Sequence, residues 1–302
     1  MSEGVYHVPV LLKEVLEGLD IQPDGVYVDV TFGGGGHSKA ILQQLSPKGR
    51  LIVFDQDADA QQNVPVDDRI LFVPHNFRHL KRFLRLHQVP PVQGILADLG
   101  VSSHQFDEAS RGFSIRFDAP LDMRMDQRAE TTAFDVVMSY SAAQLHKLFE
   151  QYGEVTNAKT LANTIVQQRD KVSLKTIENF KQALHSVVKG NPNRYFAQVF
   201  QALRIEVNDE LGALKDLLTQ IPEVLAPGGR AAIITFHSLE DRIVKNYFKK
   251  GLFEEVEDTN PFGQDTNKAP LTVVTKKPIV PSEKEQKENP RSRSAKLRIA
   301  VK

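Results

Sequence analysis

The amino-acid sequence predicts an α/β fold: a parallel sheet interrupted by an all-helical insertion. Three observations lead to this fold class. Short β-branched runs alternate with amphipathic segments over the first third of the chain, which is the pattern of βαβ units. The runs are apolar almost throughout, as in strands that are buried on both faces of a sheet. The alternation then gives way to helical periodicity and returns late in the chain as a strand-like run.

The first third of the chain supplies most of the predicted sheet. Its β-branched runs have strand length, and its amphipathic segments place apolar residues on one helical face. Turn residues such as the PKG of 47–49 separate the segments. Strands are expected at 25–32, 50–55, 69–77 and 92–101, and helices at 10–19, 37–45 and 79–86.

The middle of the chain is expected to be helical. Residues 133–188 have helical periodicity, and Ser173 is expected to cap one of the helices. A longer helical pattern follows, from Arg194 to Ile221.

The last part of the chain returns to strands. They are expected at 226–236, 271–277 and 296–301. Ser238 opens the sequence SLED, which has the form of a capping box at a helix start. Residues 1–104 and 209–302 are therefore expected to form one discontinuous α/β domain, and residues 105–208 a helical insertion that recognises the substrate.

Composition narrows the class of protein. The 302 residues are 41% apolar and 25% charged, with a formal net charge of zero, which argues against a protein that coats nucleic acid nonspecifically. The chain has no cysteine, so disulfides, thiolate metal sites and a cysteine nucleophile are excluded. No apolar run reaches membrane-spanning length, and the N-terminus lacks the features of a secretory signal. We expect a cytoplasmic protein without a metal site. A homodimer is compatible with the sequence, which does not fix the oligomeric state.

Four consecutive glycines, Gly33–Gly36, stand between the first predicted strand and the next helix. A phosphate-binding P-loop requires Lys after its last glycine, where this sequence has His37. The dinucleotide pattern GxGxxG fails in both registers, because Ser38 and Lys39 occupy the place of its third glycine. A loop that passes close to a nucleoside with an amino-acid tail, such as S-adenosyl-L-methionine (AdoMet), requires only close backbone approach. We favour this third interpretation over a tight turn without a ligand.

Two further features accompany the glycine loop. Asp55 ends the second predicted strand, where a carboxylate can accept hydrogen bonds from both ribose hydroxyls. NAD enzymes use an acid here too, so Asp55 alone does not separate the two cofactors. The turn APGGR at 226–230 resembles the segment before the fifth strand of AdoMet-dependent methyltransferases.

The sequence resembles the bacterial small-subunit rRNA cytosine methyltransferase family known as RsmH or MraW. The resemblance implies a Rossmann-like AdoMet-dependent methyltransferase sheet with an inserted helical domain. It also implies methylation of the exocyclic 4-amino group of one cytidine in the decoding region of 16S rRNA, within the small ribosomal subunit. The matching segments are 7–19, 28–42, 54–57, 98–114, 120–126, 200–211, 234–245 and 289–300, whereas 195–199 departs from the family pattern.

The resemblance also implies site residues. Asp55 would bind the ribose and Phe77 would lie against the adenine. The predicted cofactor-binding residues are Gly35, Gly36, His37, Asp55, Phe77, Asp98 and Gln105. His37 is expected to bind the cofactor carboxylate or to cap the helix that follows it.

Asp98 is the candidate catalytic residue, because it stands at the carboxyl end of the fourth strand, the usual ligand edge of such a sheet. With Ser102 or Ser103 it would orient the amine or the methionine end of the cofactor. The alternative is that Asp98 caps a helix. The sequence DLGV lacks the prolines and the aromatic residue of many amino-group methyltransferases, so the choice of an amine acceptor depends on the resemblance.

Two segments are candidate RNA ligands. Arg291, Arg293, Lys296 and Arg298 lie in an acid-free segment suited to phosphate contacts. Arg111 and Phe113 could stack on an unstacked base or pack in the core of the insertion. The basic segment 75–87 is equally compatible with RNA contact and with a solvated helix face. The alternatives for the whole protein are an NAD-dependent oxidoreductase and a noncatalytic RNA-binding assembly factor.

Overall fold

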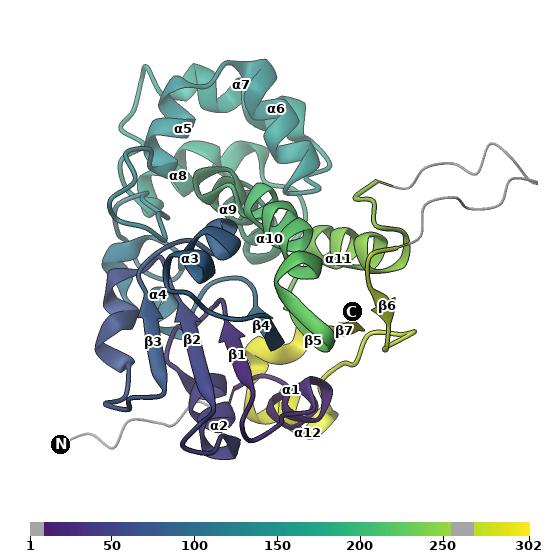
Figure 1. The fold of residues 1–302 in the computed structure, drawn as a ribbon. Helices are drawn as coiled ribbons and strands as arrows, with labels where there is room; N and C mark the ends of the chain where they lie inside the picture. The colour runs from purple at the N-terminus through teal and green to yellow at the C-terminus, as the bar shows by residue number, and fades with distance from the viewer. Residues whose placement is uncertain (1–8, 255–268) are drawn as a thin grey trace, which may run out of the picture. The chain divides into compact units, whose positions relative to one another are not determined.

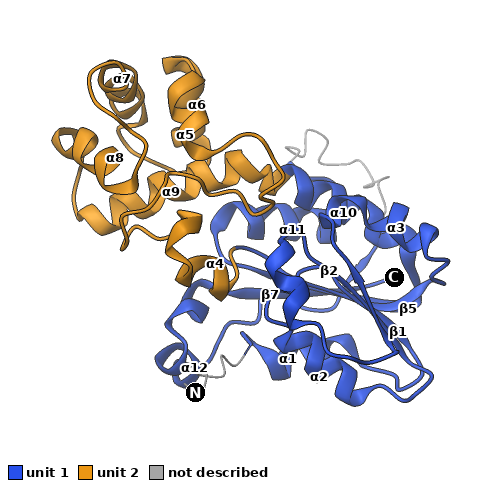
Figure 2. Ribbon diagram, turned by 90° about the vertical axis from the view of Figure 1, so that its left-hand side faces the viewer, with its two compact units in different colours: residues 1–100, 212–302 blue, residues 101–211 orange. Residues whose placement is uncertain are grey.

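The computed structural model describes residues 9–254 and 269–302 (Figure 1). His7 and Val8 of the first family-like segment lie outside the described residues. The chain divides into two compact units (Figure 2): residues 1–100 with 212–302, and residues 101–211. The sequence analysis placed the insertion at 105–208.

The first unit is built on one seven-stranded sheet in the order β3-β2-β1-β4-β5-β7-β6. Strands β1 to β5 are parallel, and β7 runs antiparallel to both β5 and β6. The predicted α/β class and Rossmann-like sheet are thus confirmed, although the sheet is mixed rather than parallel throughout. The strands are β1 Val26–Asp29, β2 Arg50–Phe54, β3 Ile70–Val73, β4 Val92–Asp98, β5 Leu225–Thr235, β6 Thr272–Val273 and β7 Lys296–Val301.

Helices cover both faces of this sheet. The first two helices, α1 (Leu12–Leu19) and α2 (Gly36–Gln44), lie against one face, and α3, α10 and α11 lie against the other (Figure 2). The bounds of the latter three are α3 Leu80–Leu86, α10 Glu210–Val224 and α11 Ser238–Lys250. Double coverage explains why the strands are apolar throughout: Leu51 to Phe54 of β2 are all buried, although their side chains alternate between faces.

The strand order indicates where a ligand site is expected. The chain builds outward from β1 through β2 to β3, then crosses back to β4 on the other side of β1. The carboxyl ends of β1 and β4 therefore open at a topological switch point, the usual position of ligand crevices in open α/β sheets. The glycine loop follows β1, and Asp98 ends β4.

The second unit is helical and has its own apolar core, to which Phe149, Phe180 and Phe200 contribute. Its helices begin at polar caps: Thr132 and Ser141 form capping boxes at α5 and α6. Its helices are α4 Ser103–Asp107, α5 Ala133–Ser139, α6 Ala142–Gln151, α7 Ala158–Gln168, α8 Ile177–Leu184 and α9 Pro192–Asn208.

Two helix boundaries differ from the prediction. Thr176, not Ser173, caps α8, because the Thr176 side chain accepts a hydrogen bond from the Asn179 backbone N–H. The helical pattern from 194 to 221 is divided between α9 and α10 at Asp209, whose φ of 45° is left-handed and ends α9.

A short helix, α12 (Glu283–Glu288), precedes β7. Within residues 9–254 and 269–302, no helix has the length and apolar character needed to span a membrane.

Candidate cofactor and active site

The four glycines of the loop have different structural surroundings. Gly33 and Gly35 have left-handed φ angles of 50° and 73°, which glycine adopts without strain. A Cβ on Gly35 would lie 2.8 Å from the Phe32 ring, and one on Gly36 would overlap the ring of Pro9. A Cβ on Gly34 would meet no heavy atom of the described residues within 4 Å. The packing of the chain thus accounts for Gly35 and Gly36, whereas Gly34 borders open space.

Asp55 holds the glycine loop against the end of β2. Its two carboxylate oxygens accept hydrogen bonds from the backbone N–H groups of Gly33, at 2.7 Å, and Asp57, at 2.9 Å. Burial raises the pKa of Asp55 to about 6, although both hydrogen bonds act to lower it. Each oxygen retains a further lone pair, so ribose binding by Asp55 stays a prediction.

Asp29 is a site residue that the sequence analysis missed. It ends β1 and is buried, and its carboxylate accepts hydrogen bonds from the Thr31 backbone N–H at 3.0 Å and the Ser38 hydroxyl at 2.6 Å. These contacts tie the start of the loop to the first turn of α2. Burial raises the pKa of Asp29, and the Ser38 hydrogen bond opposes the rise. The signal in the sequence was an acid inside an otherwise apolar strand that leads directly into the glycines.

Asp98 has an acceptor that nothing in the described chain satisfies. Its backbone N–H donates to the Thr31 hydroxyl at 2.6 Å, which links the ends of β4 and β1. Its Oδ2 lies 3.6 Å from His37 Nδ1, whereas its Oδ1 is buried and has no hydrogen-bond partner among the described residues. Burial raises the pKa of Asp98 to about 6, and the neighbouring His37 opposes the rise. A buried acceptor without a donor indicates a place for a ligand N–H or O–H.

His37 does not cap the helix that follows it, and its expected contact with the cofactor carboxylate stays a prediction. The ring is buried, with Nε2 2.9 Å from the carbonyl oxygen of Val10 and Nδ1 facing Asp98. Gly35, not His37, occupies the N-cap position of α2. This geometry argues against a contact between the ring and the cofactor carboxylate, because both ring nitrogens already face acceptors of the protein.

Phe77 and the residues after Asp98 complete the predicted set. Phe77 is half-buried and begins a short 3₁₀ turn, Phe77–His79, after β3. Ser102 and Gln105 form a capping box at α4: the Ser102 hydroxyl accepts from the Gln105 backbone N–H, and the Gln105 side chain accepts from that of Ser102. Ser102, rather than Asp98, is therefore the helix cap. The cofactor and catalytic roles of Phe77, Gln105, Ser102 and Ser103 stay predictions.

Arg111 and Phe113 are buried in the helical unit, with exposed fractions of 3% and 6%. The Arg111 guanidinium donates from Nη2 to the carbonyl oxygens of Arg124 and Met125. Phe113 belongs to the apolar core of the unit. The expectation of direct RNA contact therefore needs correction: Phe113 has the alternative role of core packing, and Arg111 braces a loop.

The basic segment 289–298 contains both exposed and buried cations. Arg298 is 8% exposed, and its guanidinium donates to both carboxylate oxygens of Asp241 on α11. Lys296 also donates to Asp241, at 3.2 Å. Because Asp241 already binds both cations, the structure argues against a phosphate contact by Arg298. It also weakens the case for such a contact by Lys296. Arg291 and Arg293 lie exposed in the 3₁₀ turn Pro290–Ser294.

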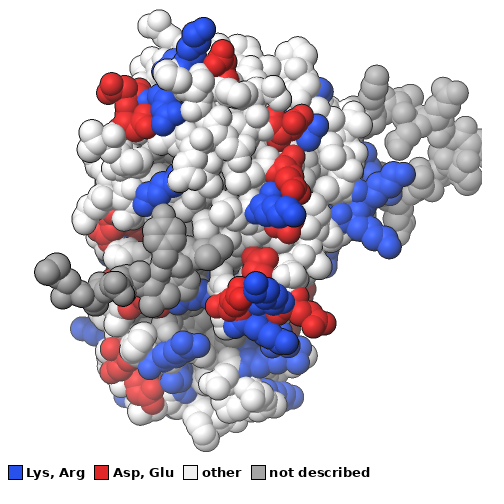
Figure 3. Space-filling model, turned by 90° about the horizontal axis from the view of Figure 1, so that it is seen from below, with Lys and Arg blue, Asp and Glu red and all other residues white. Residues whose placement is uncertain are grey.

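Other basic residues are also balanced by acids. Arg78 pairs with Asp216 at 2.8 Å, and Lys81 pairs with Glu223, so α10 neutralises part of the basic segment 75–87. Figure 3 shows basic and acidic side chains intermixed over the face viewed from below. Arg291 and Arg293 are exposed, and their contact with RNA stays a prediction.

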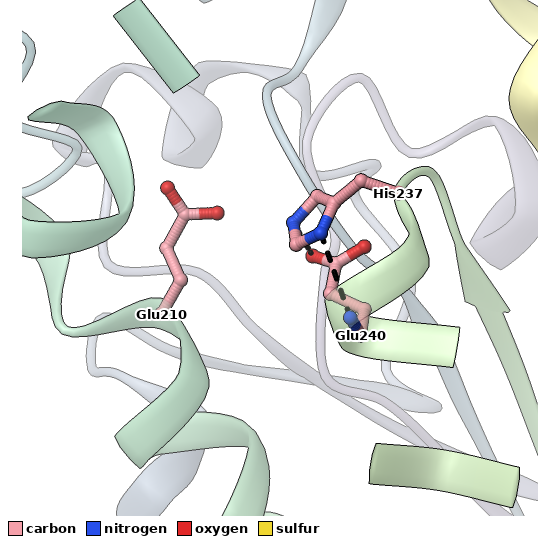
Figure 4. Close-up of side chains that lie close together, drawn as sticks. All are labelled: Glu210, His237 and Glu240. Carbon is pink, nitrogen blue, oxygen red and sulfur yellow. Dashed lines mark hydrogen bonds and ion pairs between the residues drawn. The ribbon is translucent and has the colours of Figure 1, made fainter. Parts of the chain in front are cut away.

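The start of α11 contains a second buried pair that the sequence analysis misassigned. His237, not Ser238, is the N-cap, because its Nδ1 accepts from the Glu240 backbone N–H. Figure 4 shows the two side chains together, with His237 Nε2 3.2 Å from Glu240 Oε1. Glu210, also labelled there, belongs to the helical unit, where it binds Arg204. Glu240 additionally accepts from the Phe236 backbone N–H, so its charge is held at the end of β5.

The seven-stranded sheet with β7 antiparallel beside β5, and the acids at the carboxyl ends of its parallel strands, are the arrangement of Rossmann-like AdoMet-dependent methyltransferases. A family model described as the MraW methylase family matches residues 4–302. The chain therefore belongs to the MraW methylase family.

Relatives match over their whole length. Ribosomal RNA small subunit methyltransferase H of Parabacteroides distasonis is 53% identical, and the match covers 100% of this chain and 99% of that protein. The protein of the same name from Bacteroides thetaiotaomicron is 52% identical over the same shares. A solved structure described as a putative rRNA methylase from Clostridium thermocellum covers 98% of both chains at 12% identity and a TM-score of 0.42, a likeness too distant to bear on the site.

Family membership confirms several predictions. The protein is an AdoMet-dependent methyltransferase, so the predicted enzyme class and cofactor are confirmed, as is the resemblance noted from the motifs. The alternatives of an NAD-dependent oxidoreductase and a noncatalytic assembly factor are set aside.

Proposed function

We propose that this protein methylates the exocyclic 4-amino group of a specific cytidine in the decoding region of 16S rRNA, within the small ribosomal subunit in the cytoplasm. Support for a small-subunit rRNA substrate comes from the printed names of the relatives. Support for an amine ligand comes from one observation: Asp98 Oδ1, at the carboxyl end of β4, is a buried acceptor for which the described part of the chain provides no donor.

The residues at the switch point fit AdoMet. The open space beside Gly34 leaves room for close approach of a ligand to the backbone. Asp55 offers carboxylate lone pairs for the ribose, and Phe77 offers a half-buried aromatic ring for the adenine. Asp98 offers a charged acceptor for an amine, which is carried both by the methionine end of AdoMet and by the cytosine. The set thus offers acceptors for the ribose hydroxyls and for an amine, and an aromatic surface for the adenine.

AdoMet, when bound, supplies an electrophilic methyl group. The task of the protein is to hold the attacking nitrogen in line with that group. A cytosine amine is a poor nucleophile because its lone pair is delocalised into the ring. An ionised Asp98 would orient the amine from which it accepts an N–H. That amine is either the methionine amine of AdoMet, whose contact fixes the position of the methyl group, or the cytosine amine, whose developing positive charge Asp98 would favour. The pKa of about 6 leaves Asp98 ionised at neutral pH, which this role requires.

The helical unit and the 3₁₀ turn Pro290–Ser294 are the proposed RNA-recognition parts. The first is the insertion that the sequence analysis assigned to the substrate. The second exposes Arg291 and Arg293 beside polar Asn and Ser side chains, a composition suited to phosphate contacts.

The test is methyl transfer from AdoMet with a labelled methyl group to small subunits that lack the modification, followed by mapping of the labelled nucleotide. We expect one labelled cytidine in 16S rRNA and no label on subunits already modified there. Label on another base, or none on rRNA, would refute the proposed substrate.

The same assay tests the role of Asp98. Asp98→Ala should reduce methyl transfer by about a hundredfold or more, the usual cost of losing one preorganised electrostatic contact in a transition state. Glu283→Ala, which removes an exposed carboxylate from α12, is the matched control. Near-normal turnover by Asp98→Ala, with the labelled cytidine unchanged, would remove Asp98 from the mechanism without changing the substrate assignment.

A further inference from the structure

The orientation of the His37 ring is set by a backbone group. His37 Nε2 lies 2.9 Å from the carbonyl oxygen of Val10, and a carbonyl oxygen can only accept. The ring must therefore carry its hydrogen on Nε2. Val10 is itself fixed, because the next residue, Leu11, donates its backbone N–H to Glu285 at 2.8 Å. The neighbouring Pro9 ring packs against Gly36.

With Nε2 protonated, the other nitrogen of His37 faces a carboxylate. Nδ1 lies 3.6 Å from Asp98 Oδ2, which is an ion-pair distance rather than a hydrogen bond. A neutral ring would turn a lone pair towards an anionic oxygen, and the two would repel each other. One proton between these atoms removes the repulsion, either as an imidazolium beside a carboxylate or as a neutral ring beside a carboxylic acid.

The charged groups around Asp98 determine whether its carboxyl group is ionised or neutral. Asp98 is faced by three ionisable side chains: His37 from α2, Asp29 from β1 and Glu240 from α11. The two acids oppose a charge on Asp98, and His37 alone favours it. Without the His37 proton, Asp98 would be pushed towards its neutral form, which presents an O–H donor and a poorer acceptor.

We propose that His37 is a positioning residue that shares one proton with Asp98 and thereby keeps the free oxygen of Asp98 an acceptor for the amine of the bound cofactor. In this role His37 acts on AdoMet through Asp98. The Val10 carbonyl, by fixing the ring tautomer, makes the segment before α1 part of the site. The link to AdoMet depends on the placement of the cofactor under the proposed function, whereas the shared proton depends only on the contacts of the chain.

Two substitutions separate the two nitrogens of the ring. In His37→Asn the side-chain amide nitrogen replaces Nδ1, so Asp98 keeps a donor while the Val10 contact is lost. In His37→Gln the amide nitrogen replaces Nε2, so the Val10 contact is kept while Asp98 loses its partner. A purely structural role for His37 would make the loss of the Val10 contact the more damaging change. The positioning role predicts the reverse for cofactor binding.

The first readout uses the protein without AdoMet. Carbon-detected NMR of the carboxyl groups follows the titration of Asp98 in the wild type and in both variants, and nitrogen NMR of wild-type His37 reports its tautomer. We expect hydrogen on Nε2, and an Asp98 midpoint about one pH unit higher in His37→Gln than in His37→Asn. An Nδ1–H tautomer of neutral His37, or equal midpoints in the two variants, would overturn the shared proton. The wild-type tautomer keeps the test informative even if a variant folds poorly.

The second readout is the AdoMet dissociation constant, measured by calorimetry. The pH series runs from about 5.5, near the Asp98 midpoint, to about 8, well above it. His37→Gln should bind AdoMet about tenfold more weakly than His37→Asn near pH 7, and the gap should close at higher pH, where Asp98 ionises in both. Equal affinities throughout would overturn the positioning role while leaving the methyltransferase assignment intact. Failure of the wild type itself to bind AdoMet would instead refute the cofactor placement, and with it the positioning role.

Discussion

At Asp98 the requirements of folding and of ligand binding oppose each other. The side chain ends β4 with one oxygen buried and unsatisfied, a state that costs free energy in the protein without ligand. Burial raises its pKa from 3.8 to about 6, so the folded protein binds a proton on Asp98 more readily than the unfolded chain does. A ligand N–H that donates to the free oxygen would offset this cost of burial.

Replacing Asp98 with Asn should therefore stabilise the protein without ligand at neutral and alkaline pH. A raised folded-state pKa means that the contribution of Asp98 to stability is present below about 3.8 and is lost as the pH rises through about 6. Asn does not titrate. We expect Asp98→Asn to melt about 2 °C or more above the wild type at pH 8, with a smaller gap at pH 5. A variant that melts below the wild type at pH 8 would show that the carboxylate is satisfied in solution.

The sequence was sufficient for some site residues but not for their pairing. Asp55 and Asp98 follow apolar strands, and the carboxyl ends of such strands are where ligands bind, so both could be predicted. The contact between His37 and Val10 joins two segments that are far apart in the sequence, and no local sequence pattern predicts that they meet. The same holds for Gly36 and Pro9. The roles of these residues could only be read from the fold.

At the scale of elements, the basic segment 289–298 spans a 3₁₀ turn and the start of β7, and its cations have different surroundings in the two. Residues up to Ser294 form a 3₁₀ turn, in which Arg291 and Arg293 are exposed. From Lys296 the chain is a strand, and its alternation turns Arg298 towards Asp241 on α11. The sequence showed a run of cations without acids, but the acid that binds two of them comes from another element.

Charge reversal should expose this division. Arg291→Glu with Arg293→Glu is expected to weaken binding to rRNA by about tenfold at moderate salt and to flatten its salt dependence, because two phosphate contacts are lost. Lys284→Glu with Lys287→Glu makes the same change of charge on exposed residues of α12. Binding measured over a salt series should be close to wild type for the second pair. Equal losses in both double variants would indicate a general charge effect and no contact at the turn.

The caps of α8 and α11 show why element boundaries were harder to predict than the elements. Ser173 and Ser238 each had a cap-like sequence, yet Thr176 and His237 make the capping hydrogen bonds. Several polar residues near a helix start can accept from a free N–H, so the choice depends on where the preceding strand or loop ends. The helix break at Asp209 has a similar origin, since the apolar pattern continues across it.

At the scale of the whole molecule, the order of strands and helices was predictable and the direction of the last strands was not. Alternating apolar and amphipathic segments imply crossovers and hence parallel strands. β7 instead returns antiparallel beside β5, after a segment whose sequence carries no crossover pattern. The expected ligand position follows from the parallel half alone, because the order in which the chain adds strands reverses between the neighbours β1 and β4.

The central claim is that AdoMet occupies the space bordered by Gly34. This glycine has no left-handed φ, and a Cβ there would meet no atom of residues 9–254 or 269–302 within 4 Å. Gly34→Ala and Gly34→Leu should therefore fold with nearly wild-type melting temperatures. Gly36→Ala, whose Cβ would overlap Pro9, should melt lower and serves as the contrast.

Calorimetric titration of AdoMet into the two Gly34 variants is the most direct measurement of this claim. The account predicts binding about tenfold weaker in Gly34→Ala and no measurable binding in Gly34→Leu, with both proteins folded. Wild-type affinity in both variants would contradict it, because the cofactor would then lie away from the bend that follows β1.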